Sequence, residues 1–268
     1  MFQQYYGFSS LPFSKTIATH DLFTTAAQKE LAARLTYLVR ERGVGLLTGE
    51  VGSGKSSAVR AFTASLDFNR YLVIYLANPL LGIAGLYREL LSQLGRTPPY
   101  TQARMVACLR QAFAELLSSK RRAPLVIIDE AHLLTSPMLE QLRLLFSDAM
   151  DSQALATLLL VGQPGLRRTL QLNVHEAFNQ RLSVRYQLVP LDLAETIAYI
   201  RHHVRVAGYT AGTLFTDDAL GRVFEYTKGV PRRINQVCTT ALMAGLIDQK
   251  TVLDESTIRK AIADLDHE

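Results

Sequence analysis

Short, continuous apolar runs recur along the first 190 residues, and segments with helical periodicity separate them. Four runs stand out, at 44–48, 71–76, 124–128 and 158–162. A strand is apolar at every position, rather than at every second one, when helices cover both faces of its sheet. A shorter fifth strand is expected at 187–191. The pattern predicts an α/β domain over residues 25–190, with a parallel sheet flanked by helices.

The remainder of the chain shows helical periodicity only. Breaks occur at 208–212, at 229–231 and near Gln249, and they predict a small all-helical domain over residues 191–268. Residues 1–24 carry several aromatic side chains that favour burial. We therefore expect an ordered N-terminal linker ahead of the α/β domain.

Composition narrows the class of protein. Of the 268 residues, 48% are hydrophobic and 20% are charged, so the chain can bury a core. It contains no uninterrupted apolar run of about 18 residues and no signal-peptide pattern, so we expect no membrane partner. Cys108 and Cys238 lack the spacing of a disulfide framework or a zinc site, which favours buried thiols in a cytoplasmic protein. The formal net charge of +5 permits nucleic-acid binding without requiring it.

The segment from Gly49 to Ser56 matches G-x-x-x-x-G-K-[ST] between an expected strand and an expected helix. Backbone N–H groups of such a loop close around phosphate oxygens, aided by the helix N-terminus. Lys55 is expected to reach the β- and γ-phosphates of ATP, and the Ser56 hydroxyl to coordinate Mg²⁺. The complete set of expected phosphate-binding residues is Gly49, Glu50, Val51, Gly52, Ser53, Gly54, Lys55, Ser56 and Ser57.

Two acidic residues, Asp129 and Glu130, follow the third apolar run. The carboxyl end of a parallel strand is where ligands bind in such sheets, beside the phosphate loop. Asp129 is therefore expected to hold Mg²⁺ together with Ser56, and Glu130 to act as the general base of ATP hydrolysis. The alternative is a solvated acidic pair after a core strand.

Asp129-Glu130-Ala131-His132, at this distance from the phosphate loop, resembles the corresponding motif of AAA+ ATPases. The fold expected from this resemblance is a P-loop NTPase with a small helical lid domain. The turn that ends in Gly162-Gln163-Pro164 resembles the sensor-1 turn of that family. The resemblance implies that Gln163 contacts the γ-phosphate or the attacking water. A plain cap at the end of a strand is the alternative.

Four arginines are candidates for two roles that the same resemblance implies. Arg181 lies where AAA+ proteins carry a finger that enters the neighbouring subunit's ATP site, and Arg185 is the second candidate. Gly229-Val230-Pro231-Arg232 resembles a sensor-2 helix start, so Arg232 is expected to touch the γ-phosphate, with Arg233 as its alternative. Ordinary surface arginines remain the other interpretation.

The N-terminal sequence from Tyr5 to Phe13, followed by Asp21-Leu22-Phe23, resembles the start of ExeA/GspA-like ATPases and of TnsC/TniB-type transposition regulators. This resemblance covers essentially the whole chain. It implies a linker that packs on the nucleotide site, with Leu22 and Phe23 against the adenine. Core packing of these two side chains is compatible with that role.

Within this group, the expected function is an ATP-dependent regulator of DNA transposition. Such a protein assembles with ATP into a homo-oligomeric ring or helical filament on double-stranded DNA and recruits a transposase. The alternative is the ATPase module of an ExeA/GspA-like secretion system, and a third class is a DNA-remodelling or signalling ATPase. The end of the chain at Glu268 without a membrane segment favours the transposition regulator, as an expectation.

Basic and polar residues after the second strand are the candidate DNA contacts, which should be mainly to phosphates. They are Arg96, Thr97, Tyr100 and Arg104; solvated surface residues are the alternative. The densest basic run, Lys120-Arg121-Arg122, precedes the third strand. It should lie at the edge of the sheet opposite the ATP site, as a solvated turn or a contact with a partner.

Overall fold

The computed structural model describes residues 2–14, 16–77, 79–147 and 154–266. Met1, where the expected linker begins, and Glu268, where the expected helical domain ends, lie outside the described residues. Two compact units divide the chain. The helical unit comprises Met1–Ala26, Gly52–Gly54 and Val189–Glu268, and the α/β unit comprises Ala27–Val51 and Lys55–Leu188. No helix among the described residues is both long enough and apolar enough to cross a bilayer.

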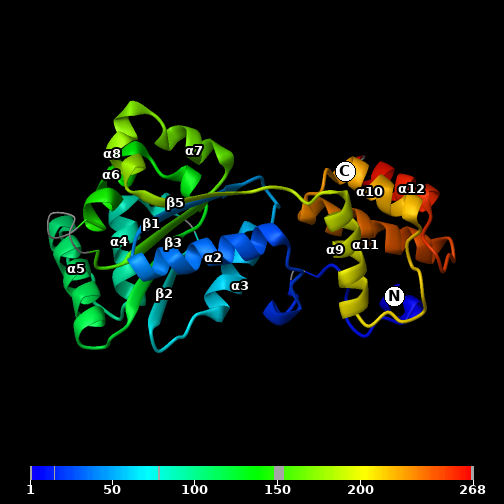
Figure 1. Cartoon of the computed structure of the whole chain (residues 1–268), viewed down its shortest axis with the longest axis horizontal. Helices are drawn as coiled ribbons and strands as arrows, with labels where there is room; N and C mark the ends of the chain where they lie inside the picture. The colour runs from blue at the N-terminus through cyan, green and yellow to red at the C-terminus, as the bar shows by residue number, and fades with distance from the viewer. Residues whose placement is uncertain (1, 15, 78, 148–153, 267–268) are drawn as a thin grey trace. The chain divides into compact units, whose positions relative to one another are not determined.

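The α/β unit is built on five parallel strands in the order β2-β3-β4-β1-β5 (Figure 1). The strands are β1 (Val44–Gly49), β2 (Tyr71–Leu76), β3 (Ala123–Ile128), β4 (Thr157–Gly162) and β5 (Leu182–Leu188). The helices are α2 (Ala26–Glu41), α3 (Lys55–Ser65), α4 (Gly82–Gln93), α5 (Gln102–Ser118), α6 (Ser136–Leu145), α7 (Pro164–Leu170) and α8 (Glu176–Gln180). Single 3-10 turns lie at Pro79–Leu81, Ala131–Leu133 and Asn173–His175.

Helices cover both faces of this sheet, which explains why its central strands are apolar throughout. In β3, Leu125 and Ile127 pack with α2 and α3, whereas Val126 and Ile128 pack with α4, α5 and α6. Side chains alternate between the two faces of a strand, so a strand buried on both sides has no polar positions. The expected parallel sheet flanked by helices is confirmed.

The fifth strand differs from the expectation. We expected 187–191, but β5 begins at Leu182 and ends at Leu188, and it pairs with β1 alone. Its residues alternate between buried and exposed positions along most of its length. A search for a continuous apolar run misses such a strand, because an edge strand needs burial at only part of its positions.

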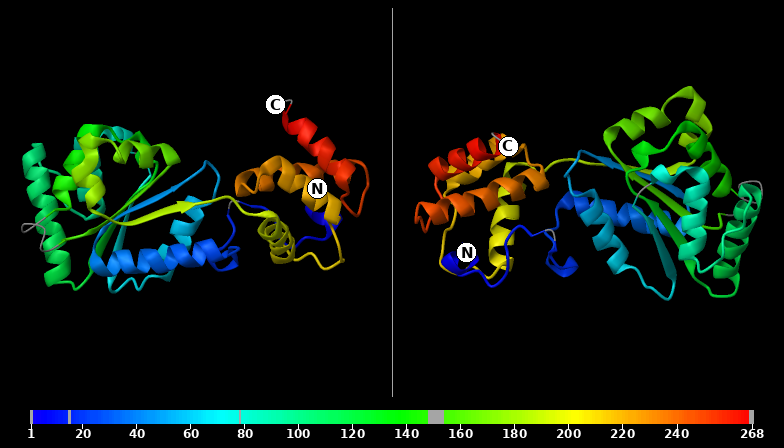
Figure 2. Two further views of the ribbon diagram at one scale, coloured as in Figure 1. Left: turned by 45° about the horizontal axis from the view of Figure 1, so that its top comes forward. Right: turned by 180° about the vertical axis from the view of Figure 1, so that it is seen from behind.

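The helical unit contains α9 (Leu193–Val206), α10 (Asp217–Thr227), α11 (Pro231–Ile247) and α12 (Glu255–Asp266), shown from two further sides in Figure 2. Its core also takes in Tyr6 and Phe8 from the start of the chain. A capping box begins α9: the Asp192 side chain accepts from the Glu195 N–H, and the Glu195 side chain accepts from the Asp192 N–H. Such a box satisfies two backbone donors that the first helical turn leaves unpaired.

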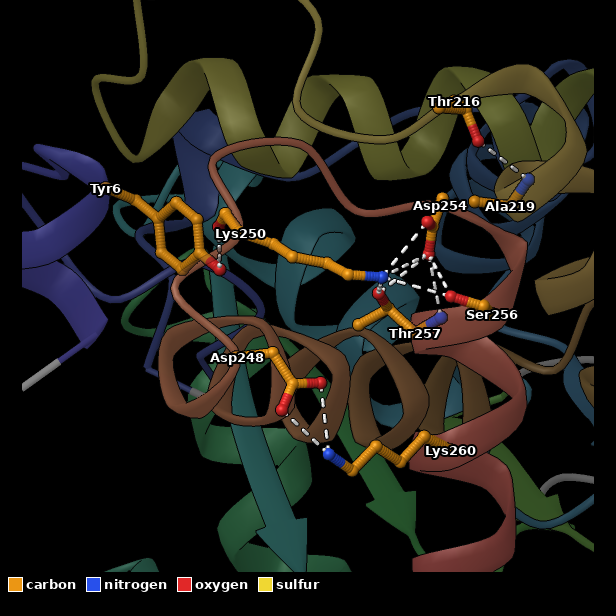
Figure 3. Close-up of polar contacts among 9 residues, drawn as sticks. All are labelled: Tyr6, Thr216, Ala219, Asp248, Lys250, Asp254, Ser256, Thr257 and Lys260. Carbon is orange, nitrogen blue, oxygen red and sulfur yellow. Dashed lines mark hydrogen bonds and ion pairs between the residues drawn. The ribbon is translucent and has the colours of Figure 1, made fainter.

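The N-terminal helix α1 (Phe2–Tyr6) is tied to the turn between α11 and α12. The Tyr6 hydroxyl donates to the Lys250 carbonyl oxygen at 3.1 Å (Figure 3). The Lys250 ammonium in turn donates to both carboxylate oxygens of Asp254 and to the hydroxyls of Ser256 and Thr257, at 2.9–3.0 Å. Hydrogen bonds from Ser256 and Lys250 hold the pKa of Asp254 well below its usual range.

The linker after α1 continues along α9, with a 3-10 turn at Thr19–Asp21. The Phe13 ring stacks on His203 with a centroid distance of 5.4 Å. The Phe23 ring meets the edge of Tyr199 at 5.7 Å, and the His202 imidazole donates to the Asp21 carbonyl oxygen at 2.6 Å. The linker is therefore ordered by aromatic packing within the helical unit.

Candidate functional site

The phosphate loop connects β1 directly to α3. Gly52 and Gly54 have φ values of +82° and +95°, a region of backbone conformation that is strained for residues with a Cβ atom. The loop can therefore turn its backbone N–H groups inward before α3 begins at Lys55. The strand–loop–helix order and the two glycine conformations fit the cradle expected from the motif.

Lys55 and Ser53 show that the loop suits a phosphate-bearing ligand. The Lys55 ammonium is buried and donates to the carbonyl oxygens of Gly49 and Glu50 at 2.9 and 2.8 Å. The Ser53 hydroxyl is also buried and has no hydrogen-bond partner among the described residues. A buried donor without a partner is costly, and a phosphate oxygen would satisfy it. The residues present therefore fit the phosphates of ATP.

The Asp129 carboxylate joins the phosphate loop to the end of β3. Its Oδ2 accepts a hydrogen bond from the Ser56 hydroxyl at 3.1 Å, and its Oδ1 accepts from the Glu130 N–H at 2.8 Å. A hydroxyl and a carboxylate in contact are the oxygen ligands that Mg²⁺ prefers. The structure thus brings together the two residues expected to hold this ion, which would neutralise charge on the phosphates during hydrolysis.

Tyr75 of β2 is a third member of this group. Its hydroxyl donates to Asp129 Oδ2 at 2.6 Å, and burial together with this hydrogen bond raises the Tyr75 pKa. Tyr75 therefore stays protonated and holds the carboxylate in one orientation.

Glu130 follows in a left-handed conformation, with φ +50° and ψ +32°. This conformation costs about 1 kcal/mol or more for a residue other than glycine, and such positions cluster at functional sites. The Glu130 carboxylate is half exposed and lies 3.4 Å from Nδ1 of His132. Its exposure fits access of a water molecule to the expected base.

His132 links Glu130 to Gln163. Nε2 of His132 lies 2.9 Å from the side-chain amide nitrogen of Gln163, so the amide donates when the ring nitrogen is unprotonated. Gln163 occupies the N-cap position of α7, but its side chain forms no capping hydrogen bond there. The side chain is thus engaged in a polar chain of Glu130, His132 and Gln163, beside the phosphate loop. Its expected contact with the γ-phosphate stays a prediction.

The two finger candidates differ in their surroundings. Arg181 precedes Leu182, which pairs with Val44 at the start of β1, whereas the phosphate loop leaves β1 after Gly49. Strand β1 spans about 20 Å, farther than an arginine side chain extends. Arg181 therefore cannot reach the phosphates bound by its own loop. Arg185 lies in β5, and its guanidinium donates to the Asn179 carbonyl oxygen.

The remaining nucleotide candidates belong to the helical unit. Arg232 and Arg233 are exposed in the first turn of α11, with Arg233 over the Tyr226 ring at 5.9 Å. The backbone N–H of Arg232 donates to the Gly52 carbonyl oxygen at 3.2 Å, and both residues belong to the helical unit. Phe23 packs on α9, as described above, and Leu22 is half-buried. Contacts of these side chains with a nucleotide stay predictions.

The four candidate DNA contacts lie between α4 and the first turn of α5. Tyr100 is 97% exposed, and Thr97 and Arg104 are exposed as well. Arg96 forms an ion pair with Glu115 of α5. Three of the four are therefore available to a partner as they stand, whereas Arg96 would have to exchange its carboxylate for a phosphate.

Our sequence reasoning missed two features of the site. In the sequence, Tyr75 is one residue of the apolar run 71–76 and has no visible functional signal. Only the pairing of β2 with β3 brings its hydroxyl to Asp129. His132 is the last residue of the Asp129–His132 motif, but its contact with Gln163 depends on the adjacency of β3 and β4. The sequence signal that could have indicated these contacts is the presence of polar residues at the ends of strands expected to be neighbours.

Sequence comparisons support the nucleotide chemistry. A family model described as an AAA domain matches residues 39–170. General secretion pathway protein A of Aeromonas hydrophila is 33% identical over 250 residues, which are 91% of this chain. The match covers 45% of that relative, so the chain spans less than half of its length.

Comparisons with solved structures show the same fold. Cdc6p of Pyrobaculum aerophilum matches with a TM-score of 0.72 at 15% identity, covering 94% of this chain and 70% of that chain. The ORC2 protein of Aeropyrum pernix in its ADPNP–ADP complexes matches with a TM-score of 0.68 at 17% identity, covering 94% and 70%. The ORC1 protein of Aeropyrum pernix in complex with DNA matches with a TM-score of 0.66 at 16% identity, covering 94% and 68%. The AAA domain and the P-loop fold support ATP hydrolysis with Mg²⁺.

Proposed function

We propose that this chain, an ATPase of the AAA+ class, is an assembly module whose ATP site is completed by a second copy, and that it serves as the ATPase module of a GspA-like secretion system. The alignment with general secretion pathway protein A carries the second part of this proposal. Its 250 residues necessarily extend over both units, rather than over the phosphate loop alone.

Completion of the site in trans rests on the position of Arg181. The phosphate loop, Asp129 and Glu130 lie at the carboxyl edge of the sheet, whereas Arg181 lies at the opposite edge. In a heterologous, head-to-tail interface, opposite edges of successive copies meet. A guanidinium entering from the neighbour would stabilise the charge that develops on the transferred phosphoryl group.

Complementation between two inactive variants tests this arrangement. Arg181→Ala removes the finger and Glu130→Gln removes the base, so each variant alone should bind ATP and hydrolyse it poorly. In an equal mixture, about a quarter of the interfaces would combine an intact base with an intact finger, and activity should return to about that fraction. A mixture that stays inactive, while both variants still assemble, would refute a finger at Arg181. The same mixture made with Arg185→Ala then tests the second candidate.

A second candidate function is a regulator of DNA transposition that assembles on double-stranded DNA with ATP and recruits a transposase. The exposed side chains of Tyr100 and Arg104 favour it, together with the net charge of +5. Two structural neighbours, the Aeropyrum pernix ORC1 protein and Drosophila ORC, are described as bound to DNA.

Analytical ultracentrifugation separates the two candidates. A regulator of transposition should form large species only when ATP and duplex DNA are both present. A secretion ATPase module should assemble with ATP to the same extent without DNA. A protein that stays monomeric with ATP and DNA would rule out the transposition candidate, and one that stays monomeric under every condition would rule out the assembly proposal.

A further inference from the structure

A basic cavity of about 350 Å³ lies in the α/β unit at the edge of the sheet where the parallel strands begin. Arg40, Arg42, Arg70 and Arg121 line it, and no acidic side chain does so among the described residues. Arg42 precedes β1, Arg70 precedes β2 and Arg121 precedes β3. The strands run from this edge to the phosphate-loop edge (Figure 1), so this arginine cavity is separate from the ATP site.

The four guanidinium groups have no acidic partner among the residues that the structure describes. The described residues provide no ion pair to any of them, whereas other arginines of the same unit, such as Arg34 and Arg143, pair with a glutamate. Arg70 lies over the ring of its neighbour Tyr71 at 5.9 Å. Four positive charges around one hollow repel each other, and an anion that enters it relieves this repulsion.

Two of these arginines occupy backbone positions that favour glycine. Arg42 and Arg121 both have φ +51°, two of six such non-glycine residues in the described part of the chain. A residue with a Cβ atom is sterically strained in this backbone conformation, so glycine is preferred there. Cations do stabilise helix C-termini, which explains an arginine inside the last turn of α2, such as Arg40. This stabilisation of helix C-termini does not explain why the strained position after α2 carries Arg42. It also does not explain why Arg70, from another loop, lines the same cavity.

We propose that the arginine cavity binds phosphodiester groups of a nucleic acid. Guanidinium groups bind phosphate oxygens through paired, charge-assisted hydrogen bonds. Three loops and the last turn of α2 bring them to a concave site, which suits a phosphate backbone rather than the flat surface of a lipid bilayer. This inference goes beyond both candidate functions, because it concerns an edge of the sheet that ATP does not occupy.

Anisotropy of a short labelled DNA duplex, measured with the full chain and without nucleotide, tests the proposal. Arg42→Gly with Arg121→Gly removes two charges and also relieves the two strained positions. Arg40→Gln with Arg70→Gln removes two charges without changing those positions. The matched control is Lys29→Gln with Arg168→Gln, two exposed cations of the same unit outside the cavity.

Each cavity variant should weaken DNA binding about tenfold or more at 0.1 M salt, and should lower the slope of log Kd against log salt by about two. The control should bind nearly as the wild type does. The glycine variant should have an unchanged or higher Tm, so that loss of binding cannot be attributed to unfolding, and its basal ATPase activity should be unchanged.

Several outcomes would overturn the proposal: cavity variants that bind DNA like the wild type, a control that loses as much affinity, or a wild type that binds no DNA without nucleotide. Equal competition by polyglutamate of the same charge would assign the cavity to an acidic protein segment instead. Binding to vesicles with phosphatidylserine that depends on the cavity, with DNA binding unaffected, would assign it to a membrane. None of these outcomes alters the ATP-dependent assembly on which the proposed function is tested.

Discussion

Acidification from pH 7 to pH 4 should destabilise the helical unit, because His203 of α9 is buried there as a neutral ring. Its exposed fraction is 4%, with the Phe13 ring stacked on one side and Tyr199 at a centroid distance of 4.4 Å. Burial, and to a smaller extent the charge of neighbouring His202, lowers the pKa of His203 from 6.5 to about 4.

The direction of the effect follows from proton linkage. Between pH 6.5 and 4, the unfolded chain binds a proton at His203 and the folded chain does not. The stability due to the neutral ring is therefore complete above pH 6.5, and it is lost as the pH falls to about 4. A difference of about 2.5 pKa units corresponds to a loss of about 3 kcal/mol in the free energy of unfolding.

The variant His203→Phe isolates this contribution. Among the described residues the His203 ring has no hydrogen-bond partner, so phenylalanine keeps the stacking on Phe13 and removes only the titration. Urea unfolding followed by circular dichroism, at several pH values, gives the stability difference between the two proteins. This difference should change by about 3 kcal/mol from pH 7 to pH 4, in favour of the variant at low pH. The contributions of the other histidines cancel, because both proteins contain them. A difference that stays constant over this range would refute the reasoning. If the phenylalanine does not fit, His203→Gln provides the same comparison.

The nucleotide site leads to three further predictions. Lys55→Ala should weaken ATP binding about 100-fold, because the ammonium would form charge-assisted hydrogen bonds to the phosphates; calorimetry showing near-normal affinity would contradict the phosphate-loop assignment. Glu130→Gln should lower the hydrolysis rate by a factor of about 100 to 10,000 with ATP affinity retained, and undiminished phosphate release would exclude Glu130 as the base. Tyr75→Phe should raise the Mg²⁺ concentration for half-maximal hydrolysis about tenfold, because the Asp129 carboxylate loses the hydroxyl that orients it. Tyr71→Phe in the same strand is the control, and an equal response of both variants would contradict this role of Tyr75.

The sequence by itself determined the phosphate loop and the central sheet. A glycine-rich loop between a strand and a helix is a local arrangement, so Gly49 to Ser56 could be assigned without knowledge of distant contacts. The continuous apolar runs of β1 to β4 likewise predicted strands covered on both faces. The edge strand β5 was placed too late in the chain, because it needs burial at only part of its positions.

Only the tertiary structure decided which distant residues meet. Tyr75 reaches Asp129 across 54 positions, and Gln163 reaches His132 across 31, because their strands pair in parallel. The same topology gathers arginines from three separate loops at the opposite edge, although the sequence shows them only as scattered charges. Local motifs specify local backbone geometry, whereas strand order, which no short segment encodes, determines the neighbours of each side chain.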